Sequence, residues 1–163
     1  MRAGERGQES GLSIERENPD QPEVKALLDA SDAYAASLYP AESNHMSDLA
    51  SLQRPEVRFF VARLEGACLG CGALIVAPDG TGEIKRMWVD PAARGQGLSR
   101  LLLAAIEAQA ANDAATIIRL ETGIHQPAAI ALYKSAGYTE IGPFGSYEED
   151  PNCLFMEKRL GGP

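Results

Sequence analysis

The sequence predicts an α/β (or α+β) fold, in which a central sheet is flanked by helices. Apolar residues recur every three to four positions in three segments, a spacing that is typical of amphipathic helices. Runs of β-forming residues bounded by Gly, Pro and Asp alternate with these segments and predict strands. The chain has 163 residues, of which 45% are hydrophobic. This is enough for one domain with a single sizeable core.

Each predicted helix has an apolar face and at least one end signal. The predicted helices cover residues 22–39, 95–112 and 126–136, and the face of the second is Leu98, Leu101, Leu102, Ala105, Ile106 and Gln109. Pro22 stands at the first helical position of the first helix, and Gly137 follows the third. The polar segment 41–54 is expected to hold a short helix with Ser43 or Asn44 as its cap.

The strands are predicted from their β-forming residues and from the turns between them. They cover residues 12–17, 57–63, 68–77, 83–89, 116–122, 138–141 and 154–158. The three strands between 57 and 89 have no helix between them, so we expect an antiparallel meander. The strand–helix–strand unit that follows requires a crossover and predicts a parallel pair. Residues 1–10 are polar and are expected to form a disordered leader before one domain at 11–163.

The overall charge of the chain limits its partners. Lys plus Arg is 15 and Asp plus Glu is 23, so 15 − 23 gives −8. This balance argues against a general nucleic-acid binder and against a polybasic membrane-surface protein. The apolar runs are far shorter than the roughly 18–20 residues that span a bilayer, so we expect a cytoplasmic protein. Locally, Lys85, Arg86, Arg94 and Arg100 outnumber Glu83 and Asp90, and 4 − 2 gives +2 over residues 83–100.

The cysteines and histidines do not predict a metal site. The chain has three cysteines, Cys68, Cys71 and Cys153, and this odd number cannot form a complete disulfide framework. Cys68 and Cys71 are three positions apart on a predicted strand and are expected to point to opposite faces, as small buried hydrophobic residues. The two histidines, His45 and His125, are far apart in the sequence.

A glycine-rich turn lies between a predicted strand and a predicted helix. The segment Arg94-Gly-Gln-Gly97 precedes the helix, whose first backbone N–H groups have no partner within the helix. Such a turn can hold a phosphate or pyrophosphate, although a plain tight turn remains an alternative. The segment lacks the Lys-Ser/Thr of a P-loop and the downstream acid of a dinucleotide-binding fingerprint.

Two motifs resemble those of the GNAT superfamily of N-acyltransferases. The segment Val89-x-Pro91-x-x-Arg94-Gly-x-Gly97 is similar to the acetyl-CoA-binding motif, with Ser99 in place of the usual Gly or Ala. The segment Ala128-x-x-Ala-Leu-Tyr133-x-x-x-Gly-Tyr138 is similar to a second family motif, in which Gln126 replaces a common Asn. The amino-acid sequence at residues 38–44, 121–126 and 142–145 also resembles that of a bacterial subgroup of acetyltransferases. The resemblance covers roughly residues 12–160.

The resemblance implies a fold and an activity. The fold is the GNAT fold, a central mixed, mostly antiparallel sheet flanked by helices. The activity is that of an acetyl-CoA-dependent N-acetyltransferase, which moves an acetyl group to a primary amine of a small molecule or amino acid by direct attack, without a metal. Protein or peptide N-acetylation and a catalytically silent CoA-binding module are the alternatives. A homodimer is common in the family, and the sequence does not decide it.

The resemblance also implies roles for particular residues. Tyr133 matches the helix tyrosine that protonates the CoA thiolate, and Glu83 and Glu121 are the two candidates for the base. The residues implied in acetyl-CoA binding are Met87, Trp88, Val89, Arg94, Gly95, Gln96, Gly97, Leu98, Ser99, Arg100, Gln126 and Tyr133. Trp88 is also expected to be a packing residue. The candidates for the acceptor site are Tyr39, Glu42, Asn44, His125 and Tyr147. The acidic run 148–150 is either a solvated loop or an attractant for a cationic amine.

Overall fold

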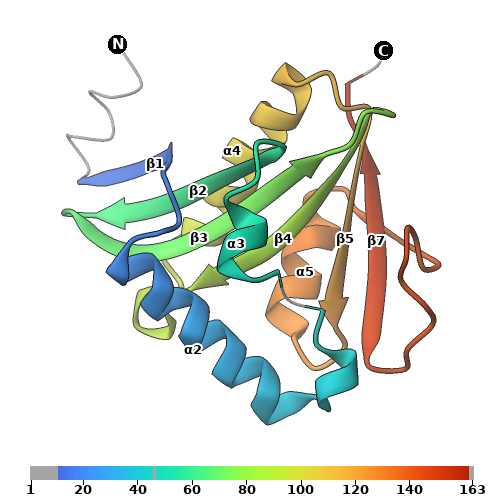
Figure 1. The fold of residues 1–163 in the computed structure, drawn as a ribbon, viewed down its shortest axis with the longest axis horizontal. Helices are drawn as coiled ribbons and strands as arrows, with labels where there is room; N and C mark the ends of the chain where they lie inside the picture. The colour runs from blue at the N-terminus through green and yellow to red at the C-terminus, as the bar shows by residue number, and fades with distance from the viewer. Residues whose placement is uncertain (1–10, 46, 162–163) are drawn as a thin grey trace.

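The computed structural model describes residues 11–45 and 47–161, and their strands form one seven-stranded sheet (Figure 1). The strand order is β1-β2-β3-β4-β5-β7-β6. The strands are β1 (Leu12–Arg16), β2 (Val57–Leu64), β3 (Ala67–Val76), β4 (Thr81–Val89), β5 (Ile117–Gly123), β6 (Thr139–Ile141) and β7 (Cys153–Arg159). Among the strands of the described residues, only β4 and β5 pair in parallel, which confirms the predicted meander and crossover. The predicted leader, residues 1–10, lies outside the described residues.

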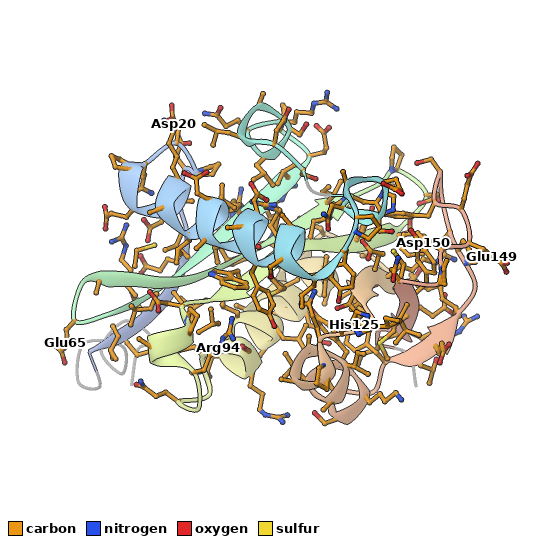
Figure 2. The ribbon with its side chains drawn as sticks, turned by 90° about the horizontal axis from the view of Figure 1, so that it is seen from below. Asp20, Glu65, Arg94, His125, Glu149 and Asp150 are labelled. Atoms are coloured by element: carbon orange, nitrogen blue, oxygen red, sulfur yellow. The ribbon has the colours of Figure 1, made fainter. Side chains whose placement is uncertain are left out.

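Helices cover both faces of the sheet (Figure 1), and the view turned by 90° shows α2 on one side of the strands and α4 and α5 on the other (Figure 2). They are α2 (Pro22–Leu38), α3 (Leu49–Leu52), α4 (Leu98–Asn112) and α5 (Pro127–Ser135), with 3₁₀ turns at Ala41–Ser43 and Pro91–Ala93. None of these described helices is long and apolar enough to cross a membrane. The predicted cap of the short helix is wrong. Asp48, whose side chain accepts from the Ser51 N–H, caps α3, and Ser43 lies in the preceding 3₁₀ turn.

The two faces of the sheet carry separate apolar clusters. Residues of α2, including Val24 and Leu27, pack with one cluster, while α4 and α5 pack with the other. The expected face of α4 is wrong at one position, because Leu101 is 43% exposed. Leu103 is buried instead at 2%, and it faces the sheet together with Leu102 and Ile106.

A β-bulge in β3 corrects the predicted orientation of the two neighbouring cysteines. Ala62 pairs with Gly70 and Arg63 with Cys68, so Leu69 is an extra residue in the ladder. A bulge shifts the alternation of side chains by one position. Cys68 and Cys71 therefore both pack in the α2-side cluster rather than on opposite faces. Both are free thiols, and burial raises the pKa of Cys71 to about 12.

A second bulge, in β4, determines the shape of the site. Arg86 has a φ of +61°, and the register between β3 and β4 shifts opposite it. Strict alternation of side chains along a strand would place Lys85 and Met87 on one face, but Met87 packs instead with Ile84 in the α4-side cluster. Arg86 points to the other face, where its guanidinium donates to Asp32 of α2 at 2.6 Å and to the Leu28 carbonyl at 3.1 Å. These contacts hold a non-glycine residue in a conformation that it rarely adopts.

Candidate active site

A cavity of about 110 Å³ lies where β4 and β5 separate. The parallel pairing of these strands ends at Ile84 and Leu120, and the strands then diverge (Figure 1). Residues 84–88 of β4 and 121–123 of β5 line the cavity, together with residues of α2, α5 and the loops at residues 43–45 and 147–152. The open strand edges leave room for a ligand to lie between them as an added strand would.

Tyr133 of α5 faces this cavity. The residue is 5% exposed, and its hydroxyl makes no hydrogen bond with the rest of the described chain. Burial, and to a smaller extent the charge of Glu121, raises the pKa of Tyr133 well above its usual value. The hydroxyl therefore keeps its proton at neutral pH and is free to donate it inside the cavity.

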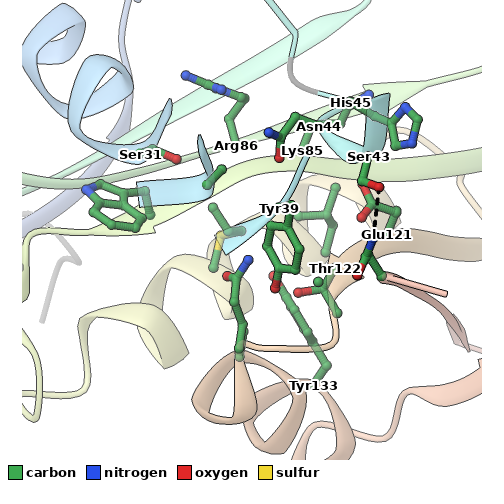
Figure 3. A pocket seen from close by; sticks show the side chains of 18 of the residues that line it. Ser31, Tyr39, Ser43, Asn44, His45, Lys85, Arg86, Glu121, Thr122 and Tyr133 are labelled. Carbon is green, nitrogen blue, oxygen red and sulfur yellow. Dashed lines mark hydrogen bonds between the residues drawn. The ribbon is translucent and has the colours of Figure 1, made fainter. Parts of the chain in front are cut away.

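Glu121 of β5 faces the same cavity. Burial raises the pKa of this carboxyl, while the neighbouring Cys153 thiol and the nearby His45 and Lys85 side chains act in the opposite direction. A carboxylate of raised pKa inside a cavity is suited to accept a proton. Figure 3 shows Glu121 and Tyr133 reaching into the cavity from different elements.

The other predicted base, Glu83, is engaged in a contact outside the cavity lining. The Tyr147 hydroxyl donates to its carboxylate at 2.6 Å, and the ammonium of Lys85 lies 3.9 Å from it. Lys85 in turn donates to the Tyr147 hydroxyl at 3.0 Å. The structure thus brings Glu121 and Tyr133 together in one cavity and leaves Glu83 bound to the β6–β7 loop.

The same loop is tied to the loop that follows α2. Ser43 donates to the Asp150 carboxylate at 2.7 Å, and the amide of Asn152 donates to the Ser43 hydroxyl at 3.2 Å. We call these three residues the latch. Asn152 and Ser43 both line the cavity, so the latch forms one of its walls. The sequence did not indicate this contact, because Ser43 and Asp150 are 107 positions apart.

The predicted acceptor residues divide into two groups. Tyr39, Asn44 and Tyr147 line the cavity, whereas Glu42 and His125 are exposed and do not. His125 still orders the site, because its backbone N–H donates to the Tyr39 hydroxyl at 3.0 Å and its ring stacks on Tyr39.

The glycine-rich loop offers unused hydrogen-bond donors. Gly95 and Gly97 have φ values of +85° and +80°, and a Cβ atom at either would meet no atom within 4 Å. The backbone N–H groups of residues 95–100 make no hydrogen bond with any described residue, and the first bond of α4 runs from Leu101 to the Gly97 carbonyl. This row of donors at a helix N-terminus is suited to a pyrophosphate.

The remaining predicted cofactor residues lie along this loop or along the cavity. Gln96, Ser99 and Arg100 are on the accessible side of the loop, while the Leu98 side chain is buried, so that only its backbone is available. Met87, Trp88 and Gln126 line the cavity, and Val89 is buried below the loop. Trp88 belongs to the α2-side cluster, as expected for a packing residue. The Arg94 guanidinium lies 4.8 Å from the Trp88 ring centre, and its Nε donates to the Val89 carbonyl.

Beside the latch, the fold brings His45 next to two ligand-type side chains of a distant segment, Asp150 and Cys153. The ligand atoms of His45, Asp150 and Cys153 lie within 4.8 Å of one another. Protein contacts account for two of them. Asp150 accepts from Ser43 and from the Asn152 N–H, and the pKa of Cys153, raised to about 12 mainly by burial, keeps its thiol protonated.

Comparison with known proteins shows the family to which the chain is similar. The model of the acetyltransferase (GNAT) family matches residues 24–138. A protein of Azospirillum brasilense named IAA acetyltransferase is 47% identical over 150 residues, which cover 91% of this chain and 98% of that protein. The solved structure of a proposed acyl-CoA N-acyltransferase from Klebsiella pneumoniae has 40% identity and a TM-score of 0.83, covering 93% of this chain and 99% of that chain.

A more distant solved structure contains the cofactor. The PaiA N-acetyltransferase of Thermoplasma acidophilum was crystallised in complex with coenzyme A and has a TM-score of 0.69. It covers 91% of this chain and 99% of its own, and at 15% identity the likeness is one of fold. The family match, the two closer relatives and the shared fold lead to one conclusion: the chain belongs to the GNAT family of acetyltransferases.

Proposed function

We propose that the protein transfers the acetyl group of acetyl-CoA to the amine of a small molecule or amino acid by direct attack. The observation that carries this proposal is the pairing of Glu121 and Tyr133 in one cavity, between strands whose edges are open. The donors of residues 95–100 would hold the pyrophosphate, and the backbone of residues 87–89 would pair with the pantetheine arm.

The proposed reaction uses each group once. Glu121 removes a proton from the acceptor ammonium, and the free amine attacks the thioester carbonyl carbon. A backbone N–H of Met87 or Val89 would stabilise the oxyanion of the tetrahedral intermediate. The attacking nitrogen loses its second proton to solvent, the intermediate collapses with cleavage of the carbon–sulfur bond, and Tyr133 gives its proton to the leaving thiolate. The amide and CoA then leave, and the protein returns to its starting state by moving the proton from Glu121 to Tyr133 through solvent.

The latch favours a small acceptor over a protein terminus. Peptide N-acetylation needs an acceptor groove that is open at both ends. We call the part of the cavity near the predicted acceptor residues Asn44 and Tyr147 its acceptor end. The latch joins the two loops beside this end, and Tyr147 attaches the β6–β7 loop to β4. A cavity walled in this way suits a compact amine better than an extended chain.

The experiment is acetyl transfer to a panel of amines, amino acids and short peptides, followed by thiol release. We expect CoA to bind in calorimetry and thiol release to require an amine of low molecular weight. Binding of CoA without any amine-dependent release would establish a silent module, and release only with peptides would establish the protein-directed alternative. Absence of both binding and release would overturn the proposal.

A further inference from the structure

The charges that line the acceptor end of the cavity are not all of one sign. Glu121 is the carboxylate there, while Glu83 lies outside the lining and accepts from Tyr147. Lys85 contributes an ammonium group, and its side chain is 18% exposed. Arg86 also lines the cavity, but its guanidinium is already engaged by Asp32. The available charges are therefore one base and one cation.

The Lys85 ammonium has hydrogen-bonding capacity to spare. It can donate three hydrogen bonds. Among the described residues it donates one, to the Tyr147 hydroxyl, and its contact with Glu83 is as long as 3.9 Å. A partly buried ammonium with free donors favours an anionic partner.

Two further side chains at this end have unused polar atoms. Asn44 and His45 line the cavity, and within the described part of the chain neither side chain makes a hydrogen bond. Figure 3 shows Asn44, His45 and Lys85 along one side of the cavity, across from Tyr133. Lys85 and His45 both lie close enough to Glu121 to lower the pKa of its carboxyl.

We propose that the acceptor is a zwitterion, an amine that also carries a carboxylate, and that Lys85 binds this carboxylate with help from Asn44 and His45. This inference rests on the proposed function, because it places the acceptor amine at Glu121. The ammonium of the acceptor pairs with Glu121 before it loses its proton, while its carboxylate pairs with Lys85 a short distance away. A polyamine would bring a second cation to Lys85 and is disfavoured by charge repulsion.

The test compares acceptors that differ only in the carboxylate. The probes are the protein amino acids, their α-amides, the corresponding decarboxylated amines, and the diamine putrescine. We expect the best amino acid to exceed its own amide and amine in kcat/KM by about tenfold or more, as a charge-assisted hydrogen bond supplies. Amides, amines or putrescine that react as well as the amino acids would overturn this inference while leaving the proposed function in place.

Variants of Lys85 assign the discrimination to this residue. Lys85→Met should reduce the ratio of kcat/KM for the acid to that for the amide by about 10- to 100-fold, and Lys85→Arg should retain most of it. Lys25→Met, at an exposed ion pair with Asp20, is the matched control. A ratio unchanged in Lys85→Met would overturn the assignment.

The two possible failures can be told apart: one is the absence of acetyl transfer to every probe, and the other is transfer without a preference for the carboxylate. If the protein binds CoA but acetylates none of the acids, amides or amines, the proposed function fails and this inference fails with it. If amines are acetylated without regard to a carboxylate, only the zwitterionic acceptor is excluded.

Discussion

The hydroxyl of Tyr147 donates a 2.6 Å hydrogen bond to the carboxylate of Glu83 and attaches the β6–β7 loop to the middle of β4. Burial raises the pKa of Tyr147, so the hydroxyl keeps the proton that it donates. The contact occupies Glu83 and positions Lys85, which donates to the same hydroxyl. The sequence makes Glu83 and Glu121 equal candidates for the base, but the structure gives them different positions. Glu83 holds the β6–β7 loop, and Glu121 faces the cavity.

Loss of the Tyr147 hydroxyl should loosen this loop. Tyr147→Phe removes a donor to a carboxylate, and we expect the free energy of unfolding to fall by about 1–3 kcal/mol. Urea unfolding measures this change, and hydrogen exchange should show faster exchange over residues 142–152. Tyr34→Phe is the matched control, because the exposed Tyr34 hydroxyl makes no hydrogen bond to the described residues. Equal losses in the two variants would contradict this role.

A side chain at residue 123 should displace Tyr39 from the cavity wall. A Cβ atom built at Gly123 would overlap the Tyr39 hydroxyl, whereas one built at Gly142 would meet no atom within 4 Å. We expect Gly123→Ala to cost about 1–3 kcal/mol in stability and to lower acetyl transfer, because Tyr39 lines the site. Thermal unfolding and kcat/KM check this, with Gly142→Ala as the control. Equal behaviour of both variants would show that Tyr39 does not need this close approach.

The glycine-rich loop should be sensitive to substitution for a reason other than strain. Gly97 and Gly66 have φ values of +80° and +82°, and neither has a neighbour within 4 Å of a built Cβ atom. Alanine at either position should cost about 1 kcal/mol in stability. Only Gly97→Ala places a methyl group where the pyrophosphate would approach, so we expect CoA affinity to fall about tenfold or more in calorimetry. A similar CoA affinity in Gly97→Ala and Gly66→Ala would contradict the proposed CoA contact.

The pH dependence of the reaction should follow Glu121. Because the base must be ionised, kcat/KM should fall by about tenfold per pH unit below the pKa of this carboxyl, which burial raises. The neighbouring Cys153 thiol lowers that pKa. Cys153→Ala should therefore raise the pKa further and move the acid limb to higher pH, with the charges of His45, Lys85 and Glu83 unchanged.

The comparison with wild type is made with one acceptor, so that the titration of the acceptor amine is common to both profiles. Cys153→Ser keeps a donor and should retain the wild-type limb. Cys68→Ala, a half-buried cysteine of β3 in the α2-side cluster, should also leave it in place. A limb that stays fixed, or moves to lower pH, in Cys153→Ala would show that the thiol does not act on the base.

The sequence predicts the helices, the order of strands and the phosphate-type loop because these depend on local patterns. Periodicity places α2 within one residue, and the glycines at 95 and 97 mark the start of α4. The bulges at Leu69 and Arg86 have no such local signal, since an arginine rarely adopts a positive φ and is held there by Asp32. Each bulge shifts the alternation of side chains, and so the predicted faces are wrong beyond it.

The acceptor end is the part of the site that the sequence predicts least well. Its walls come from contacts between Ser43 and Asp150 and between Glu83 and Tyr147, which join segments far apart in the chain. Spacing along one strand cannot show which glutamate a distant tyrosine engages. Glu83 and Glu121 therefore remain equal candidates until the folded positions of the two loops are known.

The most direct test of the account compares Glu121→Gln with Glu83→Gln in steady-state acetyl transfer to one acceptor. If Glu121 is the base, its substitution should lower kcat/KM by about 100-fold or more while CoA binding is retained. Glu83→Gln keeps a hydrogen-bond acceptor for Tyr147 and should lower kcat/KM by less than about tenfold. The reverse order, or equal losses in the two variants, would contradict the assignment of the base to Glu121.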